Sequence, residues 1–335
     1  MRAARFLLCL SLLWNAARAA DFPGHISHRD KFYQVAASGR VVLAVGYPGL
    51  VLRSDDRGST WQRITVPTGE ALFAVALLAD GRGIMVGRSG LVLTSSDAGR
   101  SWQKRDSGCR EHLFDVVFLP DDQAWAVGAF GTILHSADGG RSWQPQQYDA
   151  TPPPAEQGGV ISDAERENEG AADEARLNAV TFADGQQGWV VGEFGIILHT
   201  ADGGRTWRRQ PGASGNLLFD VLVLDGQRVL AAGAEGTLQE SSDAGASWRL
   251  LPAGSKLHFY GLAVRGRQLF ITSQEGKLFV RRPGESRLQA VDLGAPTWLN
   301  AVTFLDERLG FIVGGRGHLL YSSDGGKNWQ KITGR

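Results

Sequence analysis

Residues 177–207 read LNAVTFADGQQGWVVGEFGIILHTADGGRTW, and this stretch decides the fold. An alternating apolar run (177–182) is followed by a short apolar run that ends in Val-Gly (188–192). A third run follows Gly195, and a turn then leads to Trp207. Short β-rich runs separated by glycine-containing turns are typical of antiparallel hairpins. The stretch therefore predicts four antiparallel strands, the last of which begins at the tryptophan.

The same unit recurs along the chain, and its tryptophans give the period. They are Trp61, Trp102, Trp143, Trp207, Trp248 and Trp329. Three of the intervals between them are 41 residues, one is 64 and one is 81. The interval of 64 fits one period plus an insertion of 23, and the interval of 81 fits two periods less one residue, with one unit that lacks its tryptophan. Seven repeats of four short strands predict an all-β, seven-bladed β-propeller in which blade six is degenerate.

The domain organisation follows from the repeats and from the start of the chain. A basic start, an apolar run over 6–14 and small residues at Ala17 and Ala19 predict a signal peptide over 1–19, cleaved after Ala19. An N-terminal segment (20–32) then precedes the propeller (33–335). The blades are expected at about 33–65, 72–106, 113–146, 177–210, 218–251, 259–291 and 299–332.

The bulk composition limits the partners. Lys+Arg and Asp+Glu both number 35, so the chain lacks the basic field of a nucleic-acid-binding surface. No stretch after the leader approaches the ~20 apolar residues of a transmembrane helix. Removal of the leader leaves Cys109 as the single cysteine, which excludes an internal disulfide. We expect a monomer, periplasmic or secreted, with no nucleic-acid partner and no cofactor.

A turn of the pattern Ser/Thr-x-Asp-x-Gly-x-Ser/Thr-Trp, the Asp-box, joins the third and fourth strands of six units, with an asparagine before the tryptophan in the last copy. Its aspartates are Asp56, Asp97, Asp138, Asp202, Asp243 and Asp324. An aspartate before a turn accepts hydrogen bonds from backbone N–H groups two or three residues on. Six copies around one ring favour a structural clasp, with the tryptophan filling the gap between blades, over calcium-binding or catalytic carboxylates.

A glycine recurs in the turn between the second and third strands of all seven units. These residues are Gly49, Gly90, Gly131, Gly195, Gly236, Gly276 and Gly317. A tight hairpin turn requires a positive φ at this position, which glycine adopts without strain. The glycines are therefore predicted to be structural.

The combined unit resembles the BNR or Asp-box repeat proteins, and within them the photosystem II stability and assembly factor family. The resemblance rests on the run at 177–182, the segment 188–192, the residues from Gly195 to His199 and the Asp-box, and it extends over about 33–331. It implies a chaperone-like, non-enzymatic propeller that docks on a membrane or envelope protein during assembly. Nothing in the sequence indicates a photosynthetic host, so we expect a non-photosynthetic bacterial relative.

Propeller geometry places the turns between strands two and three on one face, together with the connections between blades. The tips of these turns differ from blade to blade while the frame is constant, as expected of a rigid scaffold that carries a recognition surface. The predicted partner-binding residues are Tyr47, Arg88, Phe130, Glu193, Phe194, Glu235, Glu275 and Arg316. Ordinary solvated turns are the alternative interpretation.

An acidic insertion (147–175) between blades three and four is predicted to overhang the same face. It is rich in Asp and Glu and contains Pro152-Pro153-Pro154, a composition typical of a segment with little structure of its own. It contacts a partner or gates the channel, or it is a tolerated surface insertion.

Two enzymatic interpretations compete with binding. A sialidase-like glycoside hydrolase needs a tyrosine nucleophile, but Tyr33 and Tyr260 occupy a repeat position also held by phenylalanine, which we interpret as core. A metal site is disfavoured because His135 and His199 are equivalent residues of neighbouring blades and no zinc-type cluster is present. We expect no catalytic residues and no metal.

A carbohydrate- or small-ligand-binding propeller remains the alternative function. Outside the Asp-boxes the mature chain offers three tryptophans for stacking on sugars, Trp125, Trp189 and Trp298. The first two end second strands and are expected in the core.

Overall fold

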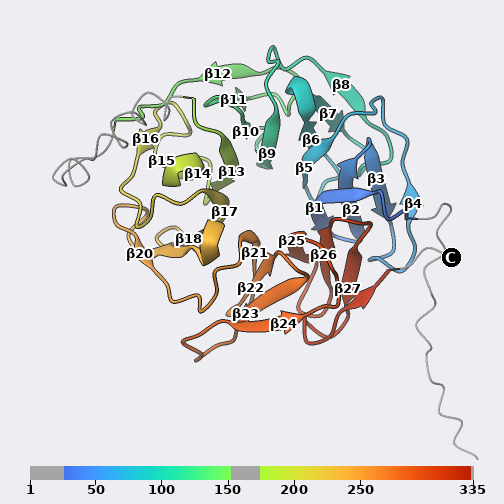
Figure 1. Cartoon of the computed structure of the whole chain (residues 1–335). Helices are drawn as coiled ribbons and strands as arrows, with labels where there is room; N and C mark the ends of the chain where they lie inside the picture. The colour runs from blue at the N-terminus through green and yellow to red at the C-terminus, as the bar shows by residue number, and fades with distance from the viewer. Residues whose placement is uncertain (1–25, 152–173, 333–335) are drawn as a thin grey trace, which may run out of the picture.

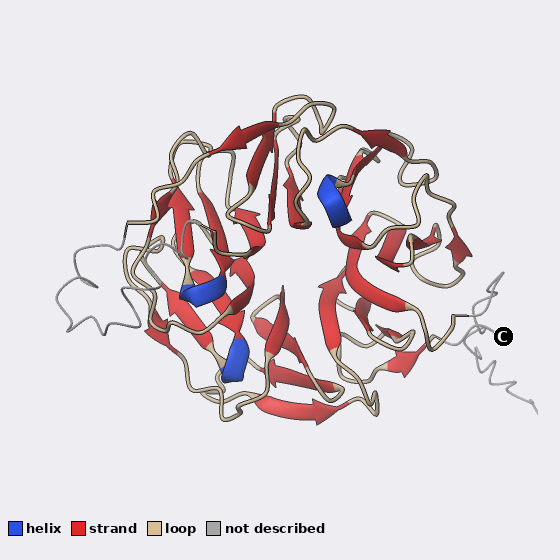
Figure 2. Ribbon diagram, turned by 45° about the horizontal axis from the view of Figure 1, so that its top comes forward, coloured by secondary structure: helices blue, strands red, loops and turns tan. Residues whose placement is uncertain are grey.

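The computed structural model describes residues 26–151 and 174–332. In these residues seven four-stranded sheets, each made of consecutive strands, are arranged in a ring around a central axis (Figure 1). Three one-turn 3-10 segments, η1 (Arg88–Gly90), η2 (Glu193–Gly195) and η3 (Ala234–Gly236), are set around the channel (Figure 2). The predicted seven-bladed all-β propeller is confirmed.

Each blade runs from an innermost strand at the channel to an outermost strand at the rim. The strands of blades one to four are β1 (Lys31–Ser38), β2 (Val41–Tyr47), β3 (Leu50–Ser54), β4 (Gln62–Arg63), β5 (Leu72–Leu77), β6 (Gly83–Gly87), β7 (Val92–Ser95), β8 (Gln103–Arg105), β9 (Leu113–Phe118), β10 (Ala124–Gly128), β11 (Ile133–Ser136), β12 (Gln144–Gln146), β13 (Leu177–Phe182), β14 (Gly188–Gly192), β15 (Ile197–Thr200) and β16 (Arg208–Arg209). Those of blades five to seven are β17 (Leu218–Val223), β18 (Val229–Gly233), β19 (Leu238–Ser241), β20 (Arg249–Leu250), β21 (Phe259–Arg265), β22 (Gln268–Ser273), β23 (Lys277–Arg281), β24 (Gln289–Asp292), β25 (Leu299–Phe304), β26 (Gly310–Gly314), β27 (Leu319–Ser322) and β28 (Gln330–Lys331).

The innermost strand of every blade carries a register shift near its start. In blade three Leu113 pairs with Gly128 and Asp115 with Val127, so Phe114 is left without a partner. The same shift occurs at the start of β1, β5, β13, β17, β21 and β25. A bulge bends its strand and re-aims the extra side chain.

The hydrophobic core lies between blades rather than within them. Trp102 of blade two packs in one cluster with Leu43 of blade one, and Trp143 of blade three packs with Ile84 of blade two. The predicted role of the Asp-box tryptophan, filling the gap between neighbouring blades, is confirmed there. In blade six Leu288 stands where the repeat would place the tryptophan, and it packs at the edge of the cluster between blades five and six.

The ring closes by packing of blade seven against blade one. Trp61 of blade one contacts Phe311 of blade seven edge-on, with ring centroids 5.9 Å apart. The Gly317 N–H donates to the Asp30 carbonyl at 2.8 Å, so the residues before β1 act as the connection from blade seven. In the described residues each sheet contains only its own four consecutive strands, so the ring closes by face packing of blades seven and one.

The Asp-box turns are held by side chain to backbone hydrogen bonds. The Asp138 carboxylate accepts from the backbone N–H and hydroxyl of Ser142 at 2.9 and 2.6 Å, and from the Ser136 hydroxyl at 2.8 Å. The clasp is therefore as predicted, but the recurrent backbone donor lies four residues on rather than two or three. An additional donor three residues on occurs at Arg141 and at Lys327.

The edges of the predicted domains are partly outside the described residues. The signal peptide (1–19) and most of the insertion (152–173) lie there. The first strand begins at Lys31, two residues before the expected start of blade one. The start of the insertion is anchored, because Asp149 forms a parallel bridge with Arg208 beside the outer edge of blade four. No helix in the described part of the chain is long and apolar enough to cross a membrane.

Candidate binding face and channel mouth

The turns between the second and third strands lie on the face that also carries the connections between blades, here called the connection face. The Gly90 N–H donates to the Glu111 carbonyl at 2.6 Å, and the Gly131 N–H donates to the Ala175 carbonyl at 2.9 Å. All seven turn glycines have a positive φ, as predicted. The turns at Gly49, Gly276 and Gly317 make the same kind of bond, so in five blades the turn is attached to the segment that enters the next blade.

The residue before the turn glycine is also left-handed in six blades. These residues are Ser89, Phe130, Phe194, Glu235, Glu275 and Arg316, with φ between 51° and 57°. Two consecutive positive φ values define a type I′ turn, which favours asparagine or glycine at its first central position. A bulky residue there is an outlier that costs of order 1–3 kcal/mol and that is concentrated at functional sites.

Large apolar side chains are exposed at these tips. Tyr47 is 41% exposed, Phe130 65% and Phe194 42%, and in the described residues only Leu250 and Val264 are comparable. Phe130 and Phe194 belong to neighbouring blades, three and four. A hollow of about 640 Å³ opens beside Phe130 and is bordered by Trp143, Pro145 and Tyr148.

The charged tip residues divide the connection face into two sides. Arg88 and Arg316 lie on blades two and seven, which flank blade one, whereas the glutamates lie on blades four, five and six. Arg88 is 3.8 Å from Glu70, a surface pair in which both side chains are more than half exposed. Glu193 is partly committed to the fold, because its carboxylate accepts from the Arg176 N–H at 3.0 Å. The eight predicted residues thus share one face but are spread around it rather than gathered in one cluster.

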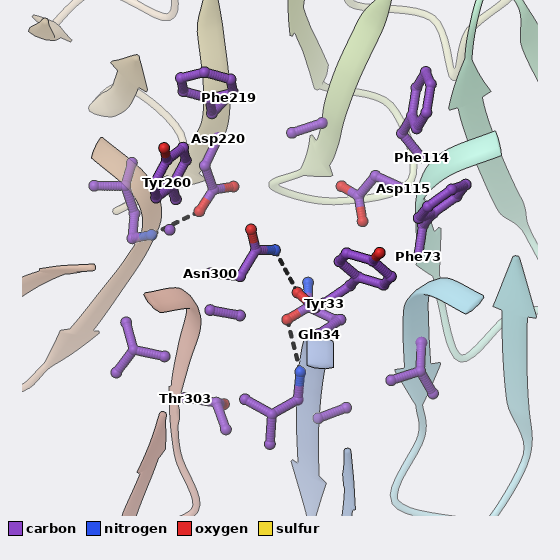
Figure 3. Close-up of a pocket in the computed structure, with 18 of the residues that line it drawn as sticks. Tyr33, Gln34, Phe73, Phe114, Asp115, Phe219, Asp220, Tyr260, Asn300 and Thr303 are labelled. Carbon is purple, nitrogen blue, oxygen red and sulfur yellow. Dashed lines mark hydrogen bonds between the residues drawn. The ribbon is translucent and has the colours of Figure 1, made fainter. Parts of the chain in front are cut away.

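The channel opens on this face through a ring of aromatic side chains, the aromatic collar. It consists of Tyr33, Phe73, Phe114, Phe219 and Tyr260. Each is the bulged residue of an innermost strand, each is half-buried, and together they border a cavity of about 360 Å³ (Figure 3). The prediction that this repeat position is core is wrong. The bulge turns the side chain from the space between blades toward the ring axis.

Asparagines take the place of the aromatic residues in two blades. The Asn178 amide donates to the Leu218 carbonyl at 2.7 Å, and the Asn300 amide donates to the Tyr33 carbonyl at 2.5 Å. Each asparagine therefore ties its blade to the next one around the channel.

A second layer of side chains rims the collar. Trp298 stacks on Tyr33 with ring centroids 5.9 Å apart and planes 4° apart. His112 lies 6.2 Å from Phe114, and the Arg176 guanidinium lies 4.6 Å from the centroid of the same ring. Of the three tryptophans considered for stacking on sugars, Trp298 alone is at the channel, whereas the other two are buried as expected.

Two carboxylates, Asp115 and Asp220, lie just below the collar on opposite sides of the cavity (Figure 3). Both retain some surface because they border the channel, but protein atoms surround them. That enclosure raises the pKa of Asp115 to about 6 and that of Asp220 to about 7. Backbone N–H groups oppose the shift only in part: Val180 donates to Asp115 at 2.9 Å and Leu262 donates to Asp220 at 2.6 Å.

No cation balances these carboxylates among the described residues. Neither forms an ion pair there, and the negative charge of Asp115 is itself one cause of the raised pKa of Asp220. The sequence itself carries a signal for this site. The apolar runs 113–118 (LFDVVF) and 217–223 (LLFDVLV) each contain an aspartate at the same position of the repeat. A charged residue inside an apolar run is unusual, because aspartate is seldom buried without a partner.

The histidines considered as metal ligands have structural partners. The His135 ring nitrogen lies 2.7 Å from the Gln123 side-chain oxygen, and His199 makes the same contact with Gln187 at 3.0 Å. Both rings pack on buried tryptophans, Trp125 and Trp189. Within the described ranges no group of three or more His, Cys, Asp or Glu side chains is placed to hold a metal.

Comparison with known proteins gives matches in family and in fold. The sequence signature of the family described as photosynthesis system II assembly factor YCF48 matches residues 60–157 and 154–214, and that of the BNR/Asp-box repeat matches 320–331. No curated protein matches the sequence.

Solved structures share the fold at low identity. A structure described as YCF48 bound to D1 peptide is 17% identical, covers 90% of this chain and 94% of its own, and has a TM-score of 0.69. YCF48 from Cyanidioschyzon merolae is also 17% identical, with coverages of 88% and 95% and a TM-score of 0.69. A GH74 enzyme of Niastella koreensis is 13% identical, with a TM-score of 0.71 over 93% of this chain and 55% of its own. The repeat, the seven blades and the family match together identify the chain as a photosystem II assembly factor-like BNR-repeat propeller.

Proposed function

We propose that this propeller is a non-enzymatic binding scaffold that docks a polypeptide segment of a membrane or envelope protein on its connection face. The observation that carries the proposal is the pair Phe130 and Phe194. Both are exposed phenylalanines held in a left-handed turn conformation, on neighbouring blades of one rigid face. Folding alone would favour asparagine or glycine there, so the aromatic side chains point to a function outside the fold.

The family match supports a protein ligand, since a structural neighbour is described as binding a D1 peptide. Aromatic residues and arginine are enriched at the centres of protein interfaces, and both are present at the tips of this face. The apolar and basic leader supports a periplasmic or secreted location, which we propose together with the binding role.

The test is cross-linking affinity purification from native cell envelopes. The wild type is compared with the double variant Phe130→Asn/Phe194→Asn, in which both turns keep a residue suited to the left-handed conformation. The matched control is Leu250→Ala, because Leu250 is 55% exposed on the outer strand β20, away from the turns. We expect one integral membrane protein to be recovered with the wild type and the control, and to be reduced about tenfold with the double variant.

Equal recovery with all three proteins would contradict docking through these turns. For the acidic insertion we propose contact with the same partner. A further variant that lacks 150–172 tests this role. Recovery that is unchanged by this deletion would identify the insertion as a tolerated surface segment.

A further inference from the structure

The channel mouth, defined as the aromatic collar with Asp115 and Asp220, has a chemistry that the binding scaffold does not require. Five aromatic rings and two carboxylates converge on one cavity of about 360 Å³ (Figure 3). The negative faces of aromatic rings attract cations, and this attraction strengthens where water is excluded. Carboxylates add a full negative charge at the base of the same cavity.

The two carboxylates lack a counter-charge. The described residues supply only backbone N–H donors to them: Val116 and Val180 to Asp115, and Val221 and Leu262 to Asp220. Amide donors compensate a buried carboxylate only partly, and two like charges that interact across a cavity oppose each other's ionisation. One positive charge between them would relieve both costs.

The protein itself shows that the collar accepts an organic cation. The Arg176 guanidinium lies 4.6 Å from the Phe114 ring centroid at the rim, where its Nε donates to the Asn178 side-chain oxygen at 2.6 Å. In the described residues no cation lies over the faces of Tyr33, Phe73 or Phe219. One face of Tyr33 is covered by Trp298, and Tyr33, Phe73 and Phe219 line the cavity, where a ligand can reach them.

We propose that the channel mouth is a receptor for one organic cation, the ammonium or guanidinium group of a lysine or arginine side chain that a docked polypeptide inserts from the connection face. The proposal rests on the proposed function, and it adds the chemistry of the partner. The cavity opens on the same face as the aromatic turn tips, so a segment that contacts the tips passes over the mouth. A long basic side chain places its charge at the carboxylates and its methylene groups against the aromatic rings.

The closing experiment is an NMR titration of the full mature chain with small probes. The backbone amides of Val180 and Leu262 are the reporters, because they donate to the two carboxylates. The probes are a blocked Gly-Lys-Gly tripeptide, its uncharged norleucine counterpart and butylammonium. At pH 8 we expect both amides to shift with the lysine peptide and not with the norleucine peptide.

The variant Asp115→Asn/Asp220→Asn removes both charges and keeps a side-chain oxygen for each amide donor. It should weaken lysine-peptide binding at least about tenfold. The control Asp121→Asn/Glu307→Gln removes two exposed charges on the opposite face and should leave binding unchanged. Thermal unfolding of each variant verifies the fold.

The pH dependence gives a second measurement that needs no variant. Binding to the wild type should weaken between pH 8 and pH 5, as the carboxylates take up protons. Other titratable or charged groups at this end of the channel are Tyr33, Tyr260, His112, His258 and Arg176. The part of the pH dependence that disappears in the double variant belongs to the carboxylates.

The outcomes separate this proposal from the proposed function. Equal binding of the lysine and norleucine peptides, or unchanged binding in the double variant, overturns the cation receptor, whereas envelope capture by the turn tips would still stand. Tighter binding of butylammonium than of the lysine peptide overturns the docked polypeptide as the source of the cation. Complete displacement of the lysine peptide by millimolar Mg²⁺ or Ca²⁺ overturns the preference for an organic cation.

Discussion

At the scale of single residues, the turn glycines combine two constraints. Gly236 has a φ of +69°, and a Cβ on it would lie 2.0 Å from the Ser255 carbonyl oxygen. Gly254 has a similar φ of +67° but open space around the same position. Substitution of each glycine by alanine therefore distinguishes the cost of backbone strain, which both share, from the cost of a steric clash, which only Gly236 has.

We predict that Gly236→Ala destabilises the protein more than Gly254→Ala. Gly254→Ala, the control, should lower the free energy of unfolding by about 1–2 kcal/mol, the penalty of an alanine in the left-handed conformation. Gly236→Ala should lower it further, because the new Cβ also displaces the connection into blade six. Urea unfolding of both variants measures the difference, and equal midpoints would show that the connection moves freely.

The left-handed phenylalanines predict a conflict between stability and binding. Phe130→Asn should raise the free energy of unfolding by about 1 kcal/mol, because asparagine adopts the left-handed region more readily and precedes glycine in the preferred type I′ sequence. The same substitution should lower capture of the partner. A rise in the thermal midpoint together with a loss of capture is the expected pattern. A fall in the midpoint would mean that Phe130 stabilises the fold through contacts, and it would weaken the functional interpretation of its conformation.

At the scale of the element, each Asp-box is a small clasp closed by one carboxylate. The pKa values of Asp97, Asp138 and Asp324 are lowered to about 2, since hydrogen bonds from the following serine or asparagine and from the backbone outweigh partial burial. A lowered pKa in the folded state means that the unfolded chain binds protons more readily. The contribution of these groups is complete above about pH 4 and is lost as the pH falls toward 2.

We predict that Asp138→Ala lowers the free energy of unfolding by about 1–3 kcal/mol, because four donors lose their acceptor. The loss should be largest at neutral pH and should shrink toward pH 2, where the wild-type carboxylate is itself protonated. Urea midpoints measured at pH 7 and pH 2.5 provide the test. An effect of equal size at both values would assign it to packing rather than to the carboxylate.

At the scale of the whole molecule, the channel carboxylates change the pH dependence of stability in the sense opposite to the Asp-box carboxylates. The folded-state pKa values of Asp115 and Asp220, about 6 and about 7, lie above the ordinary value of 3.8. The folded protein therefore binds protons more tightly than the unfolded chain. The stability that these groups contribute is complete below about pH 4 and is lost as the pH rises through 6 to 7.

The prediction is a stability maximum near pH 4 to 6 for the unliganded propeller, with a decline toward pH 8. The variant Asp115→Asn/Asp220→Asn should flatten that decline and leave in place the acidic limb, to which the Asp-boxes contribute. Thermal midpoints across pH 3–8 give the readout. An unchanged decline in the variant would assign it to other groups.

The sequence determined the architecture because the repeat carries its own local instructions. The number of blades and the order of the strands follow from the turn glycines, the six Asp-boxes and the tryptophan spacing. None of these features depends on contacts between distant parts of the chain. Propeller geometry also placed the turn tips on one face, and the predicted partner-binding residues share that face but are spread around it. Their role in binding stays a prediction, as does the periplasmic location.

Only the tertiary structure decided what lines the channel. The position held by Phe114 and Tyr260 has the composition of a core residue, and it would be core in a regular strand. A bulge of one residue, repeated in every blade, turns it toward the axis instead. Likewise, the enclosure of Asp115 and Asp220 and their interaction across the cavity depend on the closure of seven sheets into a ring. A local pattern cannot report such a contact, because the residues that meet there come from blades far apart in the chain.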